Sequence, residues 1–291
     1  MTSLRTLLPP PLRALRWRLA WVRQTPAYAE APLATLGRAL RFTLAELGGG
    51  EITARTKDGL VLATMPNNFS SFAMAVAGAR DPLIWAFIRR RLGPGAVVVD
   101  AGANVGAYTL PAARLVGPAG RVIAFEAHPA TFGFLARNVA ANGLANVTAL
   151  NLALGAGPGR VAMAFSPANP GETHVATAAE TRTTEVAMVA LDDALEGQGL
   201  GAVDYLKIDV EGFELPVLRG AARTIAASPG IVIQTELQPR HAGRYGHRIE
   251  DIAALLRGLG LDPHGLRPDG GTVRLEGTLR GDVLWMRPPA P

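Results

Sequence analysis

The sequence VVVDAGANVG at residues 97–106 decides the fold, because it carries a β-branched strand straight into a glycine turn. A short apolar run of this kind is typical of a strand buried on both faces of a parallel sheet. Gly102 and Gly106 bracket the turn, which would let the backbone approach a nucleotide and point helix N–H groups toward it. The dinucleotide fingerprint G-x-G-x-x-G is absent, since the pattern here is Asp-x-Gly-x-x-x-Gly.

Two acidic residues accompany this turn. Asp100 opens it, and Glu126 ends the next apolar strand, about 20 residues after Gly106. An acid at that distance can accept hydrogen bonds from both ribose hydroxyls of a nucleoside. Asp100 is a poor neighbour for pyrophosphate and suits a cationic or amine-bearing ligand. The turn and the second acid together predict a nucleoside cofactor; the alternative is an ordinary strand–helix turn with an acid at a strand end.

The rest of the chain from residue 95 alternates strand-like and helix-like patterns. The clearest helix is PATFGFLARNVAANGL, which Pro129 opens and Gly143 closes. The expected strands are 96–102, 121–128, 146–154, 204–210, 230–237 and 282–288, with helices near 212–226 and 249–259. This alternation predicts an α/β domain over residues 95–291, with a doubly wound, mostly parallel sheet of about seven strands. The polar, Thr-rich stretch 155–190 does not fit and is expected to form a loop or hairpin beside the sheet edge.

Residues 1–94 are expected to form an accessory segment of helices and a hairpin before this domain. The stretch 51–64 is patterned as strand, turn and strand, which predicts the hairpin. A helix follows, with Asp81 as its N-cap, Pro82 at its first position and Gly93 as its terminator.

The N-terminal stretch MTSLRTLLPPPLRALRWRLAWVRQ is basic, and the chain has no acidic residue before Glu30. Its arginines interrupt the apolar centre that a signal peptide needs. The favoured interpretation is a helix packed on the domain or a frayed terminus, because its tryptophans and leucines fall on opposite sides of a helical wheel. The alternative is a weak contact with a membrane surface.

The composition excludes several classes of function. The chain has no cysteine, which excludes disulfides, thiolate catalysis and Cys-ligated zinc and fits a cytoplasmic protein. No apolar run approaches the length of a membrane span. The net charge of +5 raises the question of a nucleic-acid partner. Lys57 and Lys207 are the only lysines, however, and no basic stretch is interleaved with aromatic residues, so we expect no nucleic-acid partner.

Charged residues interrupt an apolar stretch in KIDVEGFE, residues 207–214. Alternation places Lys207, Asp209 and Glu211 on one face of a strand and brings the acids to its carboxyl end. Ligands bind at that end in open α/β sheets. Asp209 is therefore the first candidate for a catalytic or positioning acid, and Glu211 is the second. The alternatives are that Lys207 pairs with one of the acids and that Glu211 caps the following helix.

A third acid, Glu236, ends the next strand and would face the same cleft. Asp209, Glu211 and Glu236 match the oxygen ligands that Mg²⁺ prefers. Strand-end acids are more often hydrogen-bonding groups, so we predict no metal site. His174, in the irregular stretch 155–190, is a candidate substrate contact, although a solvent-exposed loop position is favoured for it. The candidates for the acceptor entrance are His241 and His247, together with Arg240 and Arg244. A position in a solvent-exposed turn is the alternative for these residues.

Three longer segments resemble a known family: VVVDAGANVGAYTL, FEAHPATFGFLARNVAANGL and VDYLKIDVEGFELPVLRGA. An acid that opens the glycine turn and a second acid at ribose distance resemble the class I S-adenosylmethionine-dependent methyltransferases. Together the segments resemble the FkbM family of methyltransferases over residues 95–238. The Lys-Ile-Asp-Val-Glu-Gly segment, followed by Glu and Leu-x-Gly-Ala, is the most specific element. The resemblance implies the Rossmann-like class I methyltransferase fold.

The resemblance also implies that S-adenosyl-L-methionine binds here and that S-adenosyl-L-homocysteine is the product. The turn residues implied to hold it are Asp100, Gly102, Ala103, Asn104 and Gly106. Glu126 is implied to bind the ribose, and Ala127 and Ala153 to lie near the adenine. One departure concerns the adenine side, because members usually have proline after the ribose acid and here Ala127 and then His128 follow it.

The activity implied by the resemblance is O-methylation of a hydroxyl on a sugar or natural-product-like small molecule. Methyl transfer mainly requires that the acceptor is held in line with the methyl carbon, and a hydroxyl acceptor gains from a base that removes its proton. Two rival functions are a nicotinamide-dependent oxidoreductase on a Rossmann fold and a non-catalytic protein that binds a nucleoside cofactor. The first would be expected to carry the G-x-G-x-x-G turn that is missing here.

Overall fold

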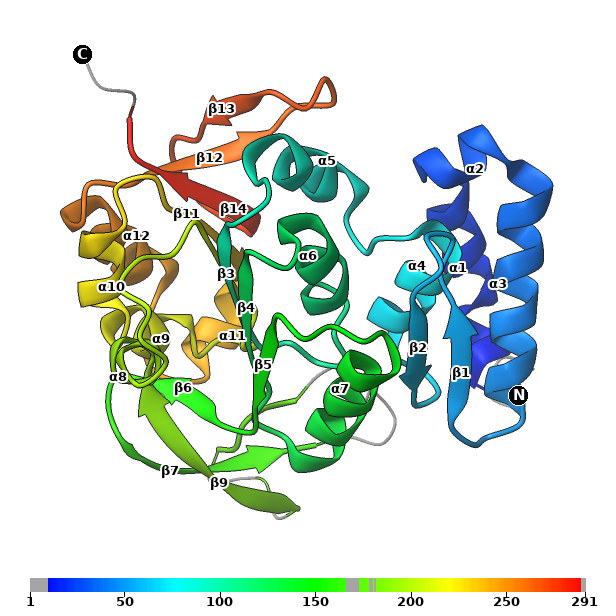
Figure 1. Cartoon of the computed structure of the whole chain (residues 1–291), viewed down its shortest axis with the longest axis horizontal. Helices are drawn as coiled ribbons and strands as arrows, with labels where there is room; N and C mark the ends of the chain where they lie inside the picture. The colour runs from blue at the N-terminus through cyan, green and yellow to red at the C-terminus, as the bar shows by residue number, and fades with distance from the viewer. Residues whose placement is uncertain (1–9, 166–172, 178–179, 181, 289–291) are drawn as a thin grey trace, which may run out of the picture.

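The computed structural model describes residues 10–165, 173–177, 180 and 182–288, with an N-terminal part beside an α/β domain (Figure 1). The N-terminal part contains α1 (Pro10–Arg23), α2 (Pro26–Glu30), α3 (Pro32–Leu47), β1 (Ile52–Arg55), β2 (Val61–Thr64) and α4 (Phe69–Ala77). The next helix, α5 (Pro82–Arg91), packs on the main sheet of the α/β domain (Figure 1). The hairpin expected at 51–64 is confirmed, since β1 and β2 pair antiparallel. Helix α5 begins at Pro82 as expected, although the Asp81 side chain makes no capping hydrogen bond.

Helix α1 packs against the other elements of the N-terminal part, which agrees with the packed helix favoured from the sequence. Val22 is fully buried in a core that also contains Phe42 and Phe72. Arg18 is buried too, and its guanidinium forms an ion pair with Glu46 of α3. Residues 1–9, which carry the start of the basic stretch, lie outside the described ranges.

The main sheet has eight strands in the order β13-β12-β14-β11-β10-β3-β4-β5. Their bounds are β3 (Val97–Ala101), β4 (Arg121–Phe125), β5 (Val147–Leu150), β10 (Tyr205–Ile208), β11 (Val232–Leu237), β12 (Asp262–Leu266), β13 (Thr272–Arg274) and β14 (Gly281–Met286). Strands β5, β4, β3, β10 and β11 are parallel neighbours, whereas β14 runs antiparallel between β11 and β12. The predicted doubly wound, mostly parallel sheet is confirmed, with eight strands where about seven were expected. The sequence did not predict β12 or β13, which extend the sheet with antiparallel pairs.

Helices cover both faces of this sheet because successive strand residues point to opposite sides. Val98 and Tyr205 belong to a core shared with α5 and α6. Their neighbours Val99 and Leu206 belong to a second core shared with α8, α9, α10 and α12. The helices of the domain are α6 (Thr109–Val116), α7 (Pro129–Ala141), α8 (Leu191–Glu196), α9 (Glu214–Arg219), α10 (Ala222–Ala227), α11 (Pro239–Gly243) and α12 (Ile249–Gly258).

A second, smaller sheet accounts for the stretch that did not fit the alternation. It has the order β6-β9-β7-β8, with β6 (Ala153–Gly155), β7 (Gly159–Ala164), β8 (His174–Val175) and β9 (Thr183–Ala190). Strands β7 and β9 pair antiparallel, as the hairpin alternative predicted. The single strand expected at 146–154 is wrong, because the chain leaves the main sheet after Leu150 and enters the small sheet at Ala153.

The helix expected near 212–226 is two short helices, α9 and α10, which break at Gly220. A Cβ on Gly220 would lie 2.0 Å from the carbonyl oxygen of Gly155. The close contact with β6 therefore requires glycine, and Gly220 lies between the two helices.

Asn138 of α7 and Asn142, the C-cap residue that follows the helix, join the N-terminal hairpin to the main domain. Asn142 exchanges hydrogen bonds with both backbone groups of Val61, at 2.8 and 2.7 Å. Asn138 does the same with Ala63, at 2.7 and 2.9 Å. One turn of helix thus presents two amides to alternate residues of β2, as a neighbouring strand would.

No single helix within the described ranges is long and apolar enough to cross a membrane. Helices α4 and α5 satisfy the same criteria of length and composition only as a pair, bent by 68° at the break between them.

Candidate active site

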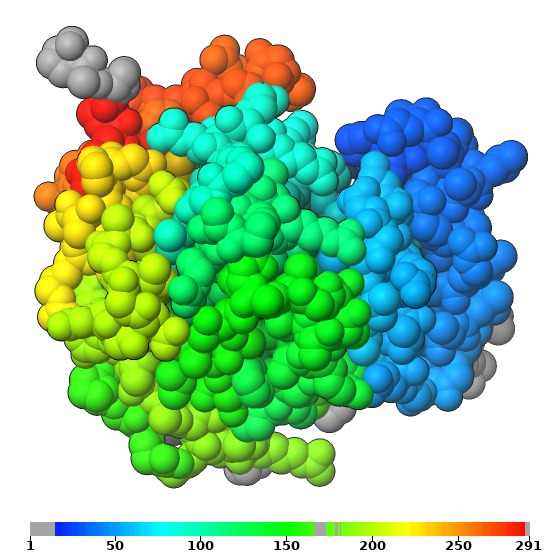
Figure 2. Space-filling model, viewed as in Figure 1, coloured from blue at the N-terminus to red at the C-terminus, as the bar shows by residue number. Residues whose placement is uncertain are grey.

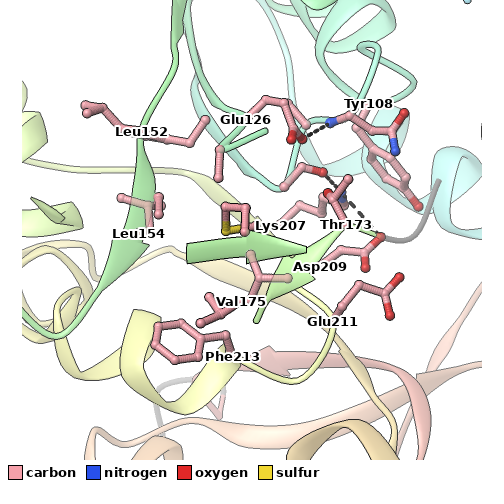
Figure 3. A pocket seen from close by; sticks show the side chains of 18 of the residues that line it. Tyr108, Glu126, Leu152, Leu154, Thr173, Val175, Lys207, Asp209, Glu211 and Phe213 are labelled. Carbon is pink, nitrogen blue, oxygen red and sulfur yellow. Dashed lines mark hydrogen bonds and ion pairs between the residues drawn. The ribbon is translucent and has the colours of Figure 1, made fainter. Parts of the chain in front are cut away.

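A cavity opens beyond the carboxyl ends of β3, β4 and β10 (Figure 3). The empty space between its lining residues is about 800 Å³, part of which is open solvent. Most residues predicted for the site line it: Gly102, Ala103, Asn104, Glu126, Ala127, Ala153, Asp209 and Glu211. The other two predicted residues, Asp100 and Gly106, lie behind this lining. Figure 3 shows Glu126 on one side of Lys207 and the carboxylates of Asp209 and Glu211 together on the other.

The glycine turn is held in a conformation that its sequence permits. Gly102, Asn104 and Gly106 have positive φ angles of 79°, 52° and 101°. A Cβ on Gly102 would lie 1.9 Å from the carbonyl oxygen of Asp209, so glycine is what allows the end of β10 to approach the turn. The backbone N–H groups of Gly102 and Ala103 donate to the carbonyl oxygen of Phe125, at 3.0 and 2.9 Å. The turn is thereby fixed between two strand ends.

Glu126 is a buried carboxylate, 2% exposed, at the wall of the cavity. Its Oε2 accepts a hydrogen bond from the backbone N–H of Asn104 at 2.9 Å, and its Oε1 accepts one from His128 at 2.9 Å. Burial raises the pKa of Glu126 to about 7, although these two hydrogen bonds act to lower it. Because a carboxylate offers about four acceptor positions, Glu126 keeps capacity for hydroxyl donors of a ligand.

Asp100 acts below the turn and not in the cavity. Its Oδ2 accepts a hydrogen bond from Thr109 Oγ1 at 2.7 Å, and its Oδ1 lies 3.3 Å from Lys207 Nζ. Lys207 Nζ donates to the carbonyl oxygen of Gly102 at 3.0 Å. Asp100 therefore acts on the turn indirectly, because it forms an ion pair with Lys207, whose Nζ binds the carbonyl oxygen of Gly102. The sequence-based alternative that Lys207 pairs with a neighbouring acid is confirmed, since its Nζ also lies 3.6 Å from Asp209 Oδ2.

Arg80 joins the site from the loop between α4 and α5. One guanidinium nitrogen lies 3.3 Å from Asp209 Oδ2, and another lies 3.1 Å from Glu236 Oε2. Arg80 lines the cavity beside Asp209. Sequence reasoning missed this residue, because nothing in AGARDP distinguishes Arg80 from the many other arginines of the chain.

Two cations therefore flank the first catalytic candidate. Burial would raise the pKa of Asp209, but the charges of Lys207 and Arg80 outweigh it and hold the pKa below its usual value. A carboxylate with a lowered pKa is a weak proton acceptor and a persistent negative charge. The arrangement suits Asp209 to positioning and charge balance better than to general-base chemistry.

The arrangement of acids also bears on the magnesium alternative. The guanidinium of Arg80 lies between Asp209 and Glu236, and the carboxylate of Glu211 turns to His241, with Oε2 2.9 Å from Nδ1. Within the described residues, no group of three His, Cys, Asp or Glu side chains is placed to hold a metal ion.

The alternative that Glu211 caps the next helix is wrong. Glu211 has a positive φ of 54°, and Gly212 follows with 104°. The helix begins at Glu214, whose own Oε1 accepts a hydrogen bond from the N–H of Gly212 at 3.0 Å. A Cβ on Gly212 would lie 2.4 Å from the carbonyl group of His241, so this turn is pressed against α11. That contact brings Glu211 and His241 together at the cavity rim.

The other candidate residues, His174, His247, Arg240 and Arg244, do not line the cavity. His174 is paired with Glu180, with Nε2 2.7 Å from Oε1, and its side chain is largely buried. Its chain neighbours Thr173 and Val175 line the cavity instead. His247 is buried against Tyr245.

Comparison with known proteins shows that the central part of the chain matches a protein-family model. Residues 100–262, more than half of the 291 residues, match the family model described as the Methyltransferase FkbM domain. The matched range contains the glycine turn, Glu126 and the segment from Lys207 to Glu214.

Individual relatives agree with this match. Methyltransferase 1 of Beauveria bassiana is 34% identical over 143 residues, which are 42% of this chain and 57% of that protein. Methyltransferase sdnD of Sordaria araneosa is 31% identical over 154 residues, 42% of this chain and 59% of its own. Hexuronic acid methyltransferase AglP of Haloferax volcanii is 26% identical over 147 residues, which are 50% of this chain and 56% of that protein. The chain thus spans less than two thirds of the length of each.

Among solved structures, a methyltransferase FkbM from Methylobacillus flagellatus is similar over 67% of this chain and 44% of its own. The sequence identity is 18% and the TM-score is 0.44. The family assignment therefore rests on the sequence matches.

Proposed function

The chain belongs to the FkbM methyltransferase family, and we propose that it transfers a methyl group from S-adenosylmethionine to a hydroxyl oxygen of a sugar or natural-product-like small molecule. The observation that supports this most strongly is the layout of the cavity. Glu126 lies on one side, the Asp209 and Glu211 carboxylates lie on the other, and the glycine turn forms the wall between them. A donor such as S-adenosylmethionine contains a ribose, which suits the Glu126 side, and a reactive cationic centre, which suits the side with the carboxylates of Asp209 and Glu211.

The residues of the donor side fit S-adenosylmethionine. Glu126 has acceptor capacity for two ribose hydroxyls. Gly102 lets the end of β10 approach the turn, so that Asp209 lines the same cavity as Glu126. Ala127 and Ala153 are small apolar residues beside Glu126 that leave space for the adenine ring. Asp100 contributes through Lys207, which holds the carbonyl of Gly102 in place.

The residues of the acceptor side divide the remaining work. S-adenosylmethionine, when bound, supplies the methyl group and leaves as S-adenosylhomocysteine. Asp209 keeps a negative charge at the cavity wall, which would favour the cationic centre of a bound donor, and its ion pair with Arg80 fixes this side of the cavity. The Glu211–His241 pair accepts the proton that the acceptor hydroxyl loses as the new C–O bond forms. The name of the hexuronic acid methyltransferase relative supports a sugar acceptor.

A thermal-shift and labelling experiment tests this function. S-adenosylmethionine and S-adenosylhomocysteine are expected to raise the melting temperature, and NAD is expected to leave it unchanged. Transfer of labelled methyl to a panel of uronic acid glycosides and polyhydroxylated natural products would then identify the acceptor. Stabilisation by NAD alone would favour the oxidoreductase instead. Donor binding without transfer to any acceptor would favour the non-catalytic binding protein.

Donor affinity is expected to depend on pH through Glu126. The ribose hydroxyls donate most strongly to the charged carboxylate, and burial raises the pKa of Glu126 to about 7. Protonation below that pH removes the charge and turns one acceptor oxygen into a donor. The affinity for S-adenosylmethionine should therefore fall about tenfold for each pH unit below about 7 and be constant above it. Titration calorimetry across this range measures the slope.

The variant Glu126→Gln is the control for this pH effect. It should bind the donor weakly at every pH, without a slope, because the amide does not titrate. Glu214, whose pKa is also about 7, is left intact in the variant. A slope that survives the substitution would assign the effect to another group, and a flat profile in the unaltered protein would remove Glu126 from donor binding.

A further inference from the structure

Helix α3 is apolar on two sides. One side, which includes Ala39, Phe42 and the buried acid Glu46, packs into the N-terminal part. We name the outer side the leucine stripe. Its residues are Leu33 (86% exposed), Leu40 (60%), Leu44 (57%) and Leu47 (40%). These positions are separated by seven, four and three residues, which places them along one line of the helix surface. Surface helices are normally polar on the outer side, so the leucine stripe requires a partner or an apolar medium.

The leucine stripe lies on the flank of the molecule away from the main sheet. In Figure 1, α3 forms the outer margin of the N-terminal part, and the same blue segment forms that flank in the space-filling view (Figure 2). The cavity lies in the α/β domain, at the ends of β3, β4 and β10. The stripe therefore does not belong to the site described above.

A basic groove runs beside the leucine stripe. It is lined by Arg38, Arg41 and Arg55 together with Thr53 and apolar residues of α3, α4 and β1, and no acidic side chain lines it. Arg41 and Ala45, two of its lining residues, directly follow Leu40 and Leu44 in the helix. Apolar and basic surface thus adjoin along one edge of α3.

These arginine charges are not neutralised nearby. Arg41 and Arg55 are exposed, and neither forms an ion pair with any described residue. The single acid of α3, Glu46, is buried against Arg18 and does not face outward. The charge of this surface is therefore complementary to an anionic partner.

From this combination we propose that the leucine stripe and the basic groove form a docking surface for an anionic lipid membrane. Leucines along one line of a surface helix can enter the boundary between headgroups and acyl chains. Arginines beside them reach the lipid phosphates and the negative surface potential. A second copy of this chain is less well matched, because pairing two such stripes would bring the uncompensated arginines of both copies together.

Vesicle co-sedimentation of the full chain tests this surface. The protein is expected to bind vesicles of phosphatidylcholine mixed with phosphatidylserine, to bind phosphatidylcholine alone poorly, and to dissociate as salt is raised. The double variant Arg41→Glu/Arg55→Glu should weaken binding to the mixed vesicles by about tenfold or more. Leu40→Gln/Leu44→Gln should weaken it comparably, and these exposed substitutions should leave the circular dichroism spectrum unchanged.

Two substitutions elsewhere serve as matched controls. Arg257→Glu reverses an exposed charge on α12, and Leu83→Gln removes a 46% exposed leucine from α5. Both should bind the mixed vesicles as the unaltered protein does.

Three results would overturn the proposal. The first is failure of the folded protein to bind the mixed vesicles. The second is binding by the stripe and groove variants that equals binding by the unaltered protein. The third is a concentration-dependent dimer that Leu40→Gln/Leu44→Gln dissociates. The last result, measured by sedimentation velocity, would assign the stripe to a second copy of the chain. None of these measurements depends on methyl transfer, so they are independent of the proposed activity.

Discussion

Replacement of Glu46 by glutamine is expected to lower the free energy of unfolding by about 3–5 kcal/mol. Arg18 and Glu46 are 2% and 3% exposed, and the substitution would leave the guanidinium of Arg18 buried without its counter-charge. Glu46 Oε1 also accepts a hydrogen bond from the N–H of Asn67 at 2.9 Å, which the amide preserves only in one orientation. Urea denaturation followed by circular dichroism measures the change.

The double variant Arg18→Met/Glu46→Leu distinguishes the unpaired charge from lost packing. It removes both charges and keeps apolar volume between α1 and α3, so most of the stability should return. The guanidinium carbon of Arg18 lies 4.5 Å from the centroid of the Phe72 ring, a contact that methionine can partly replace. A loss below about 1 kcal/mol for Glu46→Gln alone would show that water reaches this pair and that it does not hold α1 in place.

Replacement of Asp209 by asparagine is expected to lower turnover about 10²–10³-fold under saturating S-adenosylmethionine, with the fold intact. The carboxylate offsets Lys207 and Arg80, which lie 3.6 and 3.3 Å from its Oδ2. A neutral amide would leave two cations beside the cavity, where a sulfonium would be repelled. Single-turnover methyl transfer measures the effect, and equal turnover by the variant would remove Asp209 from the mechanism.

Glu236→Gln is the matched control for this substitution. Glu236 binds the same guanidinium as Asp209 but does not line the main cavity. A modest loss is expected, because Arg80 keeps its contacts with Asp209 and Asp81. If both variants lost activity equally, the release of Arg80, and not the charge of Asp209, would be the cause.

The donor side of the site could be predicted from sequence because its determinants are local. The run from Val97 to Gly106 contains the buried strand, the acid and both glycines, so one short segment specifies the turn. Glu126 follows one strand later and needs only the parallel pairing of β3 and β4 to arrive at the cavity. The parallel sheet itself follows from the alternation of strands and helices.

The acceptor side was predicted less well because distant segments assemble it. Arg80 lies 129 residues before Asp209 in the chain, and its role depends on how the α4–α5 loop folds over β10. The pairing of Glu211 with His241 depends on positive φ angles at Glu211 and Gly212 and on the contact with α11. No periodicity in the sequence encodes such a turn.

The strand predicted at 146–154 failed for a local reason that hydropathy does not show. Six of its nine residues are apolar, and three have polar side chains. One of these, Asn151, donates to the carbonyl oxygens of Glu126 and Ala127, at 2.9 and 2.8 Å. These bonds lie where the chain passes from the main sheet to the small one, and they hold Ala127 beside Ala153 at the cavity wall.

The two asparagines at the C-terminal end of α7 have a consequence for self-association. A two-stranded hairpin exposes backbone donors and acceptors along its outer edges, and such an edge is a template for cross-β pairing between molecules. Asn138 and Asn142 saturate the groups of Val61 and Ala63 that face away from β1. Side chains of a helix thus stand in for a third strand, and that edge of the hairpin is closed to a strand from another molecule.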